Sequence, residues 1–109
     1  MKKLKYHYVS GSLFMMLVVT NVQAAGDAAV GESAYSAMGC VGCHGAAGTS
    51  VMPDTFPTLS GLEEEYIVAQ LKAFRGGERE NAIMQPMSAG LKDEDIANVA
   101  AYLAAQKGK

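Results

Sequence analysis

The sequence predicts an all-α fold of three main helices joined by loops. Apolar residues recur at helical spacing in three separate segments, whereas the alternating β-branched stretches typical of strands are absent. Two cysteines three positions apart are followed directly by a histidine, at Cys40, Cys43 and His44. Such a cluster points to a bound group around which short helices could be organised.

The amino-terminal residues predict an export signal. Three lysines among the first five residues precede an apolar core at 13–19, and small residues follow up to Ala24. This apolar core is too short to cross a bilayer as a helix, which needs ~20 residues. We therefore expect a signal peptide over 1–24, a single mature domain over 25–109 and a periplasmic location.

The charge of the predicted mature chain argues against two classes of partner. Its 85 residues carry six Lys or Arg and 11 Asp or Glu, a formal charge of −5. An acidic chain is a poor ligand for nucleic acid or for an anionic membrane surface. At this length a core made only of side chains would also be marginal, so a buried apolar group would add needed area.

The first predicted helix begins after Asp27, whose carboxylate can cap it, and is expected to run directly into Cys40. A glycine on its apolar face costs ~1 kcal/mol relative to alanine, so Gly31 indicates that another backbone passes close by. The residues expected to share that face are Ala28, Gly31, Tyr35 and Met38.

An irregular loop rich in Gly, Pro, Ser and Thr is predicted over 45–61, followed by a second helix. Glu63, Glu64 and Glu65 would open this helix, and Gly76 with Gly77 would end it. Its apolar side is expected to comprise Leu62, Tyr66 and Ala69 with the neighbouring stripe Ile67, Leu71 and Phe74.

The third helix is predicted to begin near Lys92 or Asp93 and to end at Lys107 and Gly108. The acidic run at 93–95 is a favourable first turn for the helix dipole. The apolar face should hold Ile96, Val99, Ala100 and Leu103, with Tyr102 on the flank.

The segment Cys40, Val41, Gly42, Cys43, His44 is the attachment sequence of a c-type haem. Both thiols can add across the two vinyl groups of one porphyrin while the adjacent imidazole reaches the iron. In an exported chain this interpretation is preferred over a cytosolic redox or zinc site. We expect one covalent haem c bound through Cys40 and Cys43, with His44 as an axial iron ligand.

Elimination leaves two candidates for the second axial ligand. His7 would leave with the signal peptide, which excludes a second histidine within one mature chain. Met38 belongs to the first helix face, and Met52 is too close to His44 to cross to the opposite haem face. Met84 and Met87 remain, because both lie in a Gly- and Pro-containing loop after the second helix. Of these two we select Met84, with Met87 as its rival.

With these residues in view, the sequence resembles a monohaem class I c-type cytochrome, similar to one half of a bacterial periplasmic dihaem cytochrome c. The resemblance rests on the opening 25–32, on C-V-G-C-H-G and on 56–61, which is similar to the family's proline loop. It implies the small cytochrome c fold wrapped around one haem. It also implies that the Pro57 carbonyl accepts a hydrogen bond from the ligand histidine.

The same resemblance implies a helix crossing in which Gly31 and Tyr35 meet Val99 and Tyr102, with Leu103 against the haem. Counting back seven residues from Leu91, as in relatives of this group, gives Met84 as the iron ligand. One departure is Lys92, where relatives carry a serine or threonine cap whose loss costs ~1 kcal/mol.

These observations predict a soluble single-electron carrier of a respiratory chain, a monomer with no enzymatic activity and no membrane insertion after signal cleavage. Its redox partners could include a terminal oxidase or a quinol-oxidising complex. The alternative is an electron-transfer subunit of a larger periplasmic or membrane-bound oxidoreductase complex. A small haem peroxidase is disfavoured because no histidine remains to act as distal acid or base, and Arg75 and Arg79 lie beside a turn.

Overall fold

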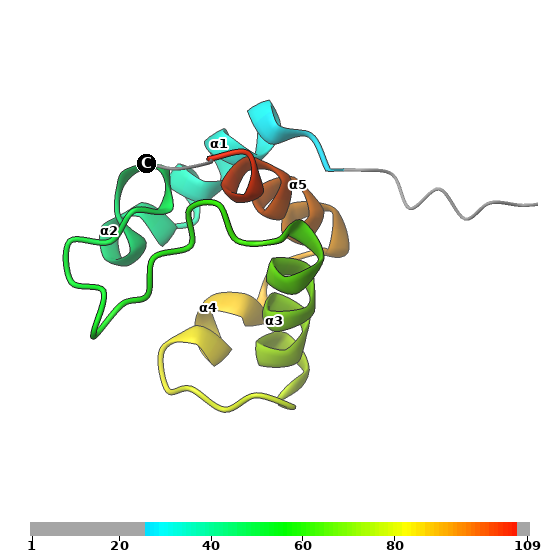
Figure 1. Ribbon diagram of the computed structural model, residues 1–109. Helices are drawn as coiled ribbons and strands as arrows, with labels where there is room; N and C mark the ends of the chain where they lie inside the picture. Colours follow the sequence, from blue (N-terminus) through cyan, green and yellow to red (C-terminus); the bar gives the residue numbers. More distant parts are fainter. Residues whose placement is uncertain (1–25, 107–109) are drawn as a thin grey trace, which may run out of the picture.

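Three helices form the frame of the computed structural model, which describes residues 26–106 (Figure 1). They are α1 (Ala28–Ala37), α3 (Glu64–Gly76) and α5 (Asp93–Ala104). Two short helices, α2 (Cys40–His44) and α4 (Met84–Ala89), and a 3₁₀ turn, η1 (Ala46–Gly48), complete the secondary structure of this range. The predicted all-α class is therefore confirmed. The predicted signal peptide and His7 lie outside the described residues. The predicted end of the last helix at Lys107 and Gly108 was wrong, because α5 ends at Ala104.

Helices α1 and α5 pack closely against each other. A β-carbon at Gly31 would collide with the backbone carbonyl of Asn98, which confirms the predicted close approach. The Asn98 side chain accepts a hydrogen bond from the Asp27 amide at 2.8 Å, and Asp27 itself caps α1. The rings of Tyr35 and Tyr102 meet with centroids 5.6 Å apart, as the crossing predicted.

The first helix ends earlier than predicted. Gly39 adopts a left-handed conformation at φ +81°, which stops α1 before the cysteines and lets α2 start in a new direction. Ala28 is exposed and only Gly31 and Tyr35 are buried on the expected face. The expectation of one continuous helix into Cys40 was wrong, because a glycine placed at its end favours termination.

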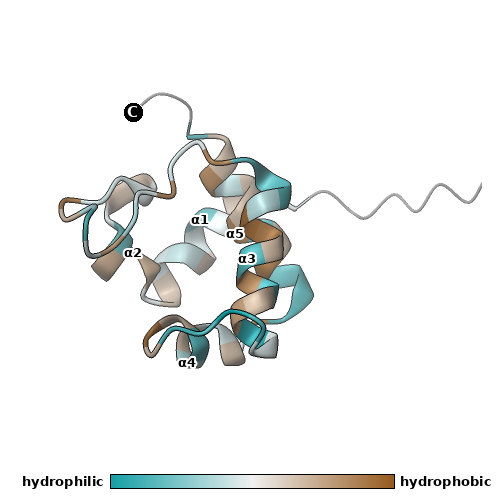
Figure 2. Ribbon diagram, turned by 60° about the horizontal axis from the view of Figure 1, so that its bottom comes forward, coloured by the Kyte–Doolittle hydropathy of each residue, from teal (hydrophilic) through white to brown (hydrophobic). Residues whose placement is uncertain are grey.

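One buried cluster joins α1, α3 and α5. Its members are Tyr35, Ile67, Val99, Ala100 and Leu103. On α3 the inner stripe is the one containing Ile67 and Phe74, while Tyr66 and Ala69 are exposed, so two of the six residues predicted for its apolar side were wrong. Mean apolarity alone does not distinguish two neighbouring stripes of one helix. Figure 2 shows these helices from another side, coloured by hydropathy, with α3 next to α5.

The segment predicted as a loop after α3 instead contains the short helix α4. The Asn81 side chain accepts hydrogen bonds from the Ile83 and Met84 amides at 3.0 and 2.9 Å, which satisfies two free donors at its start. Pro86 falls in the first turn of α4, where its missing N–H removes no helical bond. Helix α4 packs against α3.

The start of α5 confirms the predicted boundary at Lys92 and Asp93. The Lys92 side chain makes no cap, but the Asp95 carboxylate accepts a hydrogen bond from the Lys92 amide at 2.9 Å. Arg75 of α3 forms an ion pair with Asp93 at 2.6 Å, and its guanidinium holds the pKa of that carboxyl below its usual range. Within residues 26–106 we find no helix of sufficient length and apolarity to cross a membrane.

Because α1 and α5 cross closely at Gly31, replacing this glycine by alanine should destabilise the protein, although the same change usually stabilises a helix. Gly31→Ala should gain ~1 kcal/mol of helix propensity, but the clash with the Asn98 carbonyl should cost more. We expect the free energy of unfolding of the holoprotein, measured by denaturant titration, to fall by about 2 kcal/mol.

Gly90→Ala is the matched control, because Gly90 has a negative φ and a β-carbon there would meet nothing within 4 Å. Its effect should stay within about 0.5 kcal/mol. Equal stability of the two variants would contradict the packing argument.

The missing cap of α5 predicts that Lys92→Ser stabilises the protein. The Lys92 backbone is extended, as a capping residue requires, and Asp95 already completes the reciprocal bond. We expect a gain of up to ~1 kcal/mol, read as a higher melting temperature. Lys92→Ala removes the same charge without adding a cap and should give no gain; a melting temperature of Lys92→Ser at or below wild type would be the contrary result.

Candidate haem site

The attachment sequence forms its own helix, α2, after the turn at Gly39. Cys40 and Cys43 are three residues apart, so their side chains lie on one side of this helix. Both are partly buried and line the same cavity as His44. Before haem attachment, burial, the largest effect, raises the pKa of the Cys40 thiol above its ordinary value.

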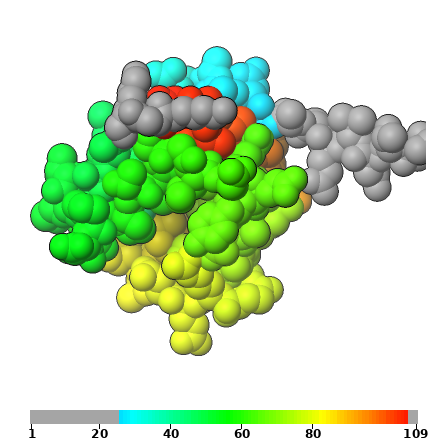
Figure 3. Space-filling model, in the orientation of Figure 1, coloured from blue at the N-terminus to red at the C-terminus, as the bar shows by residue number. Residues whose placement is uncertain are grey.

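A cavity of about 330 Å³ lies in the middle of the fold. Residues of α1, α2, α3, α4 and α5 and of the loop 45–61 line it, and most of them are apolar. Figure 3 shows this loop, in green, covering one face of the molecule, with the residues around α4, in yellow, below it. The cavity is thus walled by segments from the whole length of the described chain.

The imidazole of His44 is held by one hydrogen bond. Its Nδ1 lies 2.8 Å from the carbonyl oxygen of Pro57, and only 7 % of the residue is exposed. Because a carbonyl oxygen can only accept, Nδ1 carries the proton and Nε2 is left with a free lone pair. The predicted contact between His44 and Pro57 is therefore present. The Phe56 ring meets the imidazole edge-on, with centroids 6.5 Å apart.

Tyr35 ties α1 to the end of α2. Its hydroxyl donates a hydrogen bond to the Gly45 carbonyl at 2.6 Å. Burial, the largest effect, raises the pKa of Tyr35 to about 12, with further contributions from Cys40 and Tyr102. The phenol therefore stays protonated, and available as a donor, across the physiological pH range.

The four methionines of the described residues differ in their placement. Met84 is partly buried and lines the cavity. Met87 also lines it but is 44 % exposed, and its terminal methyl lies against Gly39 at the turn before α2. Met38, expected in the core, lines the cavity instead, and Met52 is half-exposed in the loop.

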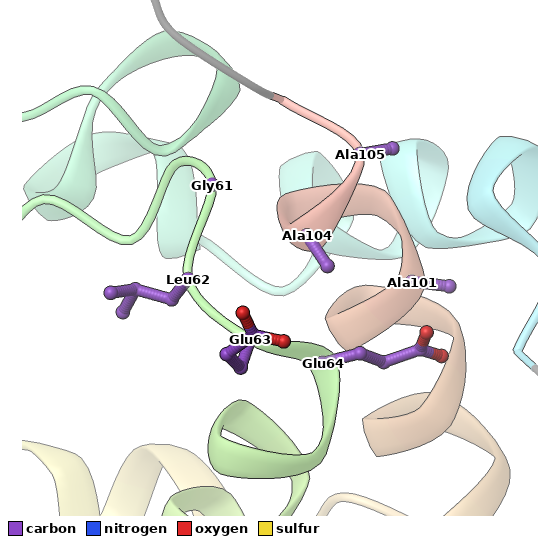
Figure 4. A pocket seen from close by; sticks show the side chains of 7 residues that line it. All are labelled: Gly61, Leu62, Glu63, Glu64, Ala101, Ala104 and Ala105. Atoms are coloured by element: carbon purple, nitrogen blue, oxygen red, sulfur yellow. The ribbon is translucent and has the colours of Figure 1, made fainter.

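A second hollow, of about 380 Å³, lies where the segment before α3 passes the end of α5 (Figure 4). Its lining contains no cysteine, histidine or methionine and consists of Gly61, Leu62, Glu63, Glu64, Ala101, Ala104 and Ala105. This hollow therefore contains none of the residues expected to bind haem.

The sequence did not identify several residues of the cavity wall. Ser88 is the clearest case: it is completely buried, lines the cavity and leaves its hydroxyl without a hydrogen-bond partner among the described residues. Its position four residues after Met84 is the signal that could have found it, but that signal needs α4 to be a helix. Gln70, Arg79 and Asn81 add polar groups to the same wall.

The residues present fit a c-type haem. The cavity is largely apolar, two cysteines on one helix side can form the thioether bonds, and an imidazole with a free Nε2 faces the same space. The buried hydroxyl of Ser88 is a further sign that a bound group completes this site, because buried polar atoms are nearly always paired.

Comparison with known proteins gives a consistent result. The family model of cytochrome c matches residues 28–107. Cytochrome c-554(548) of Halomonas halodenitrificans is 44% identical over 86 residues, covering 76% of this chain and 100% of that protein.

Longer relatives match over about half of their length. Cytochrome c4 of Pseudomonas aeruginosa is 41% identical over 97 residues, which is 88% of this chain and 47% of that protein. A thiosulfate dehydrogenase electron acceptor of Stutzerimonas stutzeri is 37% identical over 102 residues, covering 91% of this chain and 47% of that protein. The chain thus spans about half the length of these two relatives.

The Tyr35 hydroxyl predicts a loss of stability in alkaline solution. The phenol is harder to ionise in the folded chain than in the unfolded one, so its stabilising effect is complete below pH 10 and lost as the pH rises toward about 12. Tyr35→Phe should cost ~1 kcal/mol at pH 7 and should reduce the dependence of the unfolding free energy on pH in this window.

Denaturant titrations of both holoproteins at several alkaline pH values provide the measurement. Tyr102→Phe is the control, because it removes only the smaller effect of the neighbouring phenol and keeps the bond from Tyr35 to Gly45, so it should retain most of the alkaline slope. An alkaline slope identical in Tyr35→Phe and wild type would contradict the assignment.

Proposed function

The chain belongs to the cytochrome c family, with haem c attached through Cys40 and Cys43, and we propose that it is a periplasmic single-electron carrier whose iron is held by His44 and Met84. The observation that carries this proposal is the hydrogen bond between His44 Nδ1 and the Pro57 carbonyl, together with Met84 on the wall of the same cavity.

The fixed imidazole supports His44 as one ligand. With its proton held on Nδ1 by Pro57, the ring presents Nε2 to the cavity in a defined orientation. A hydrogen bond of this kind also makes the ligand nitrogen more basic and keeps the ring from rotating. Only 7 % of His44 is exposed, so the rest of the ring is held by the surrounding chain.

The placement of the two candidate methionines supports Met84 as the other ligand. Met84 is partly buried at the first turn of α4, where the Asn81 side chain fixes its backbone amide. Met87 lies toward solvent and against the turn that precedes the cysteines, which places its thioether near the attachment side. The resemblance-based count from Leu91 agrees with the choice of Met84.

Two axial ligands from the chain suit electron transfer and leave no coordination position for a substrate. When bound, haem c supplies a one-electron couple between Fe(II) and Fe(III), and a thioether opposite an imidazole favours Fe(II) relative to two imidazoles. The chain's own residues orient the ligands and exclude water.

The surface near the attachment side supports brief docking to redox partners. Val41, Ile83 and Met87 are exposed apolar side chains around the cysteines and the start of α4. A small apolar area favours rapid release over tight binding. The charge of −5 after residue 24 favours partners that carry a basic patch. One relative is named as an electron acceptor of thiosulfate dehydrogenase, which supports an oxidoreductase as the class of electron donor.

Replacing each methionine tests the ligand assignment. Met84→Ala should abolish the sulfur-to-iron charge-transfer band of the oxidised protein and lower the reduction potential by more than about 0.1 V, within the roughly 0.8 V span that axial ligands cover. Met87→Ala is the matched control and should keep the band. Loss of the band in Met87→Ala, with retention in Met84→Ala, would assign the ligand to Met87.

A further inference from the structure

The segment that carries Met84 is fastened to α3 at both of its ends. Helix α4 lies beside α3, and the chain then continues into α5 (Figure 1). At the start of the segment the Arg79 amide donates a hydrogen bond to the Ala73 carbonyl at 3.1 Å, and the Asn81 side chain caps α4. At its other end the fastening is made by the side chain of Arg75, which lies in the last turn of α3.

The Arg75 guanidinium joins α3 to the junction between α4 and α5. Its Nη1 donates a hydrogen bond to the Leu91 carbonyl at 3.0 Å, and its Nη2 lies 2.6 Å from a carboxylate oxygen of Asp93. Only 28 % of the Arg75 side chain is exposed, so its apolar stem is largely covered by the fold. One planar group thus holds two nearby points of the chain.

Leu91 passes this attachment on to α4. Its amide donates a hydrogen bond to the Ser88 carbonyl at 3.1 Å, while its carbonyl accepts from Arg75. Ser88 belongs to the last turn of α4 and Met84 to the first. The Leu91 residue also lines the haem cavity. A continuous path of two hydrogen bonds and one short helix therefore connects Arg75 with Met84.

The bond to Leu91 is the stronger half of this attachment. An ion pair with an exposed carboxylate such as Asp93 contributes little to stability. A hydrogen bond from a charged donor is stronger than one between neutral groups. From these contacts, and resting on Met84 as the axial ligand, we propose that Arg75 is a positioning residue that keeps Met84 on the iron by holding α4 against α3.

The consequence of losing this attachment is local. When α4 moves away from α3, the thioether leaves the iron and a ligand from solvent takes its place, with no electron gained or lost. The bonds from Arg75 to Leu91 and Asp93 belong to the closed arrangement, because they join α3 to the end of this segment. Removing them raises the population of the open arrangement and leaves the crossing of α1 and α5 intact.

The test measures how fast imidazole displaces the methionine in the oxidised holoprotein. Loss of the sulfur-to-iron charge-transfer band reports the exchange, and at saturating imidazole the rate equals the rate of opening. Arg75→Leu removes the donors and keeps an apolar stem. Lys72→Leu is the matched control, because Lys72 is an exposed residue of the same helix and the change removes the same charge.

A second control separates local opening from overall stability. Gly31→Ala is expected to destabilise the protein at the crossing of α1 and α5, which involves neither α3 nor α4. We expect opening to be about tenfold faster in Arg75→Leu, as the loss of a hydrogen bond from a charged donor implies. The charge-transfer band should still be present before imidazole is added. Both controls should open within about twofold of wild type.

Two results would overturn the inference. One is an opening rate in Arg75→Leu no faster than in Lys72→Leu. The other is an equal acceleration in Gly31→Ala, which would show that overall stability sets the rate. Failure of the ligand assignment is distinguishable, because it would appear as a charge-transfer band retained in Met84→Ala, whatever the rates measured for Arg75→Leu.

Discussion

The close approach of α1 and α5 at Gly31 is the constraint on which the rest of the structure depends. It allows Asn98 to bond the Asp27 amide and brings Tyr35 against Tyr102. Because α2 follows α1 after the turn at Gly39, this crossing also sets where the cysteines begin. Leu103, on the same stretch of α5, reaches the cavity and completes its wall.

Backbone carbonyls of the loop connect that frame to His44, the proposed iron ligand. The Gly45 carbonyl accepts from Tyr35 and the Pro57 carbonyl accepts from His44. The loop is itself fastened to α5, since the Gly61 amide donates to the Leu103 carbonyl at 2.9 Å. An irregular segment therefore holds the imidazole through bonds that need no particular side chain, only the correct path of the chain.

Sequence reasoning succeeded where the signal was local or covalent. The attachment motif, the Asp27 cap of α1, the boundaries of α3, the start of α5 and the close approach at Gly31 depend on residue types at fixed spacing. It failed where a few residues could form either of two local structures, a loop or a helix at 84–89 and one of two neighbouring stripes on α3. Helix α4 depends on the Asn81 side chain capping a segment that also contains Pro86, and the inner stripe of α3 is chosen by its neighbours. Ser88 could not be found before α4 was known to be helical.

The central claim is that one imidazole and one thioether, both supplied by this chain, occupy the axial positions of a covalently bound iron. X-ray absorption at the iron edge of the oxidised holoprotein tests this most directly, because it reports the atoms bound to the metal. We expect one sulfur ligand among nitrogen neighbours, with six-fold coordination. Coordination by nitrogen and oxygen alone, or a five-coordinate iron, would contradict it.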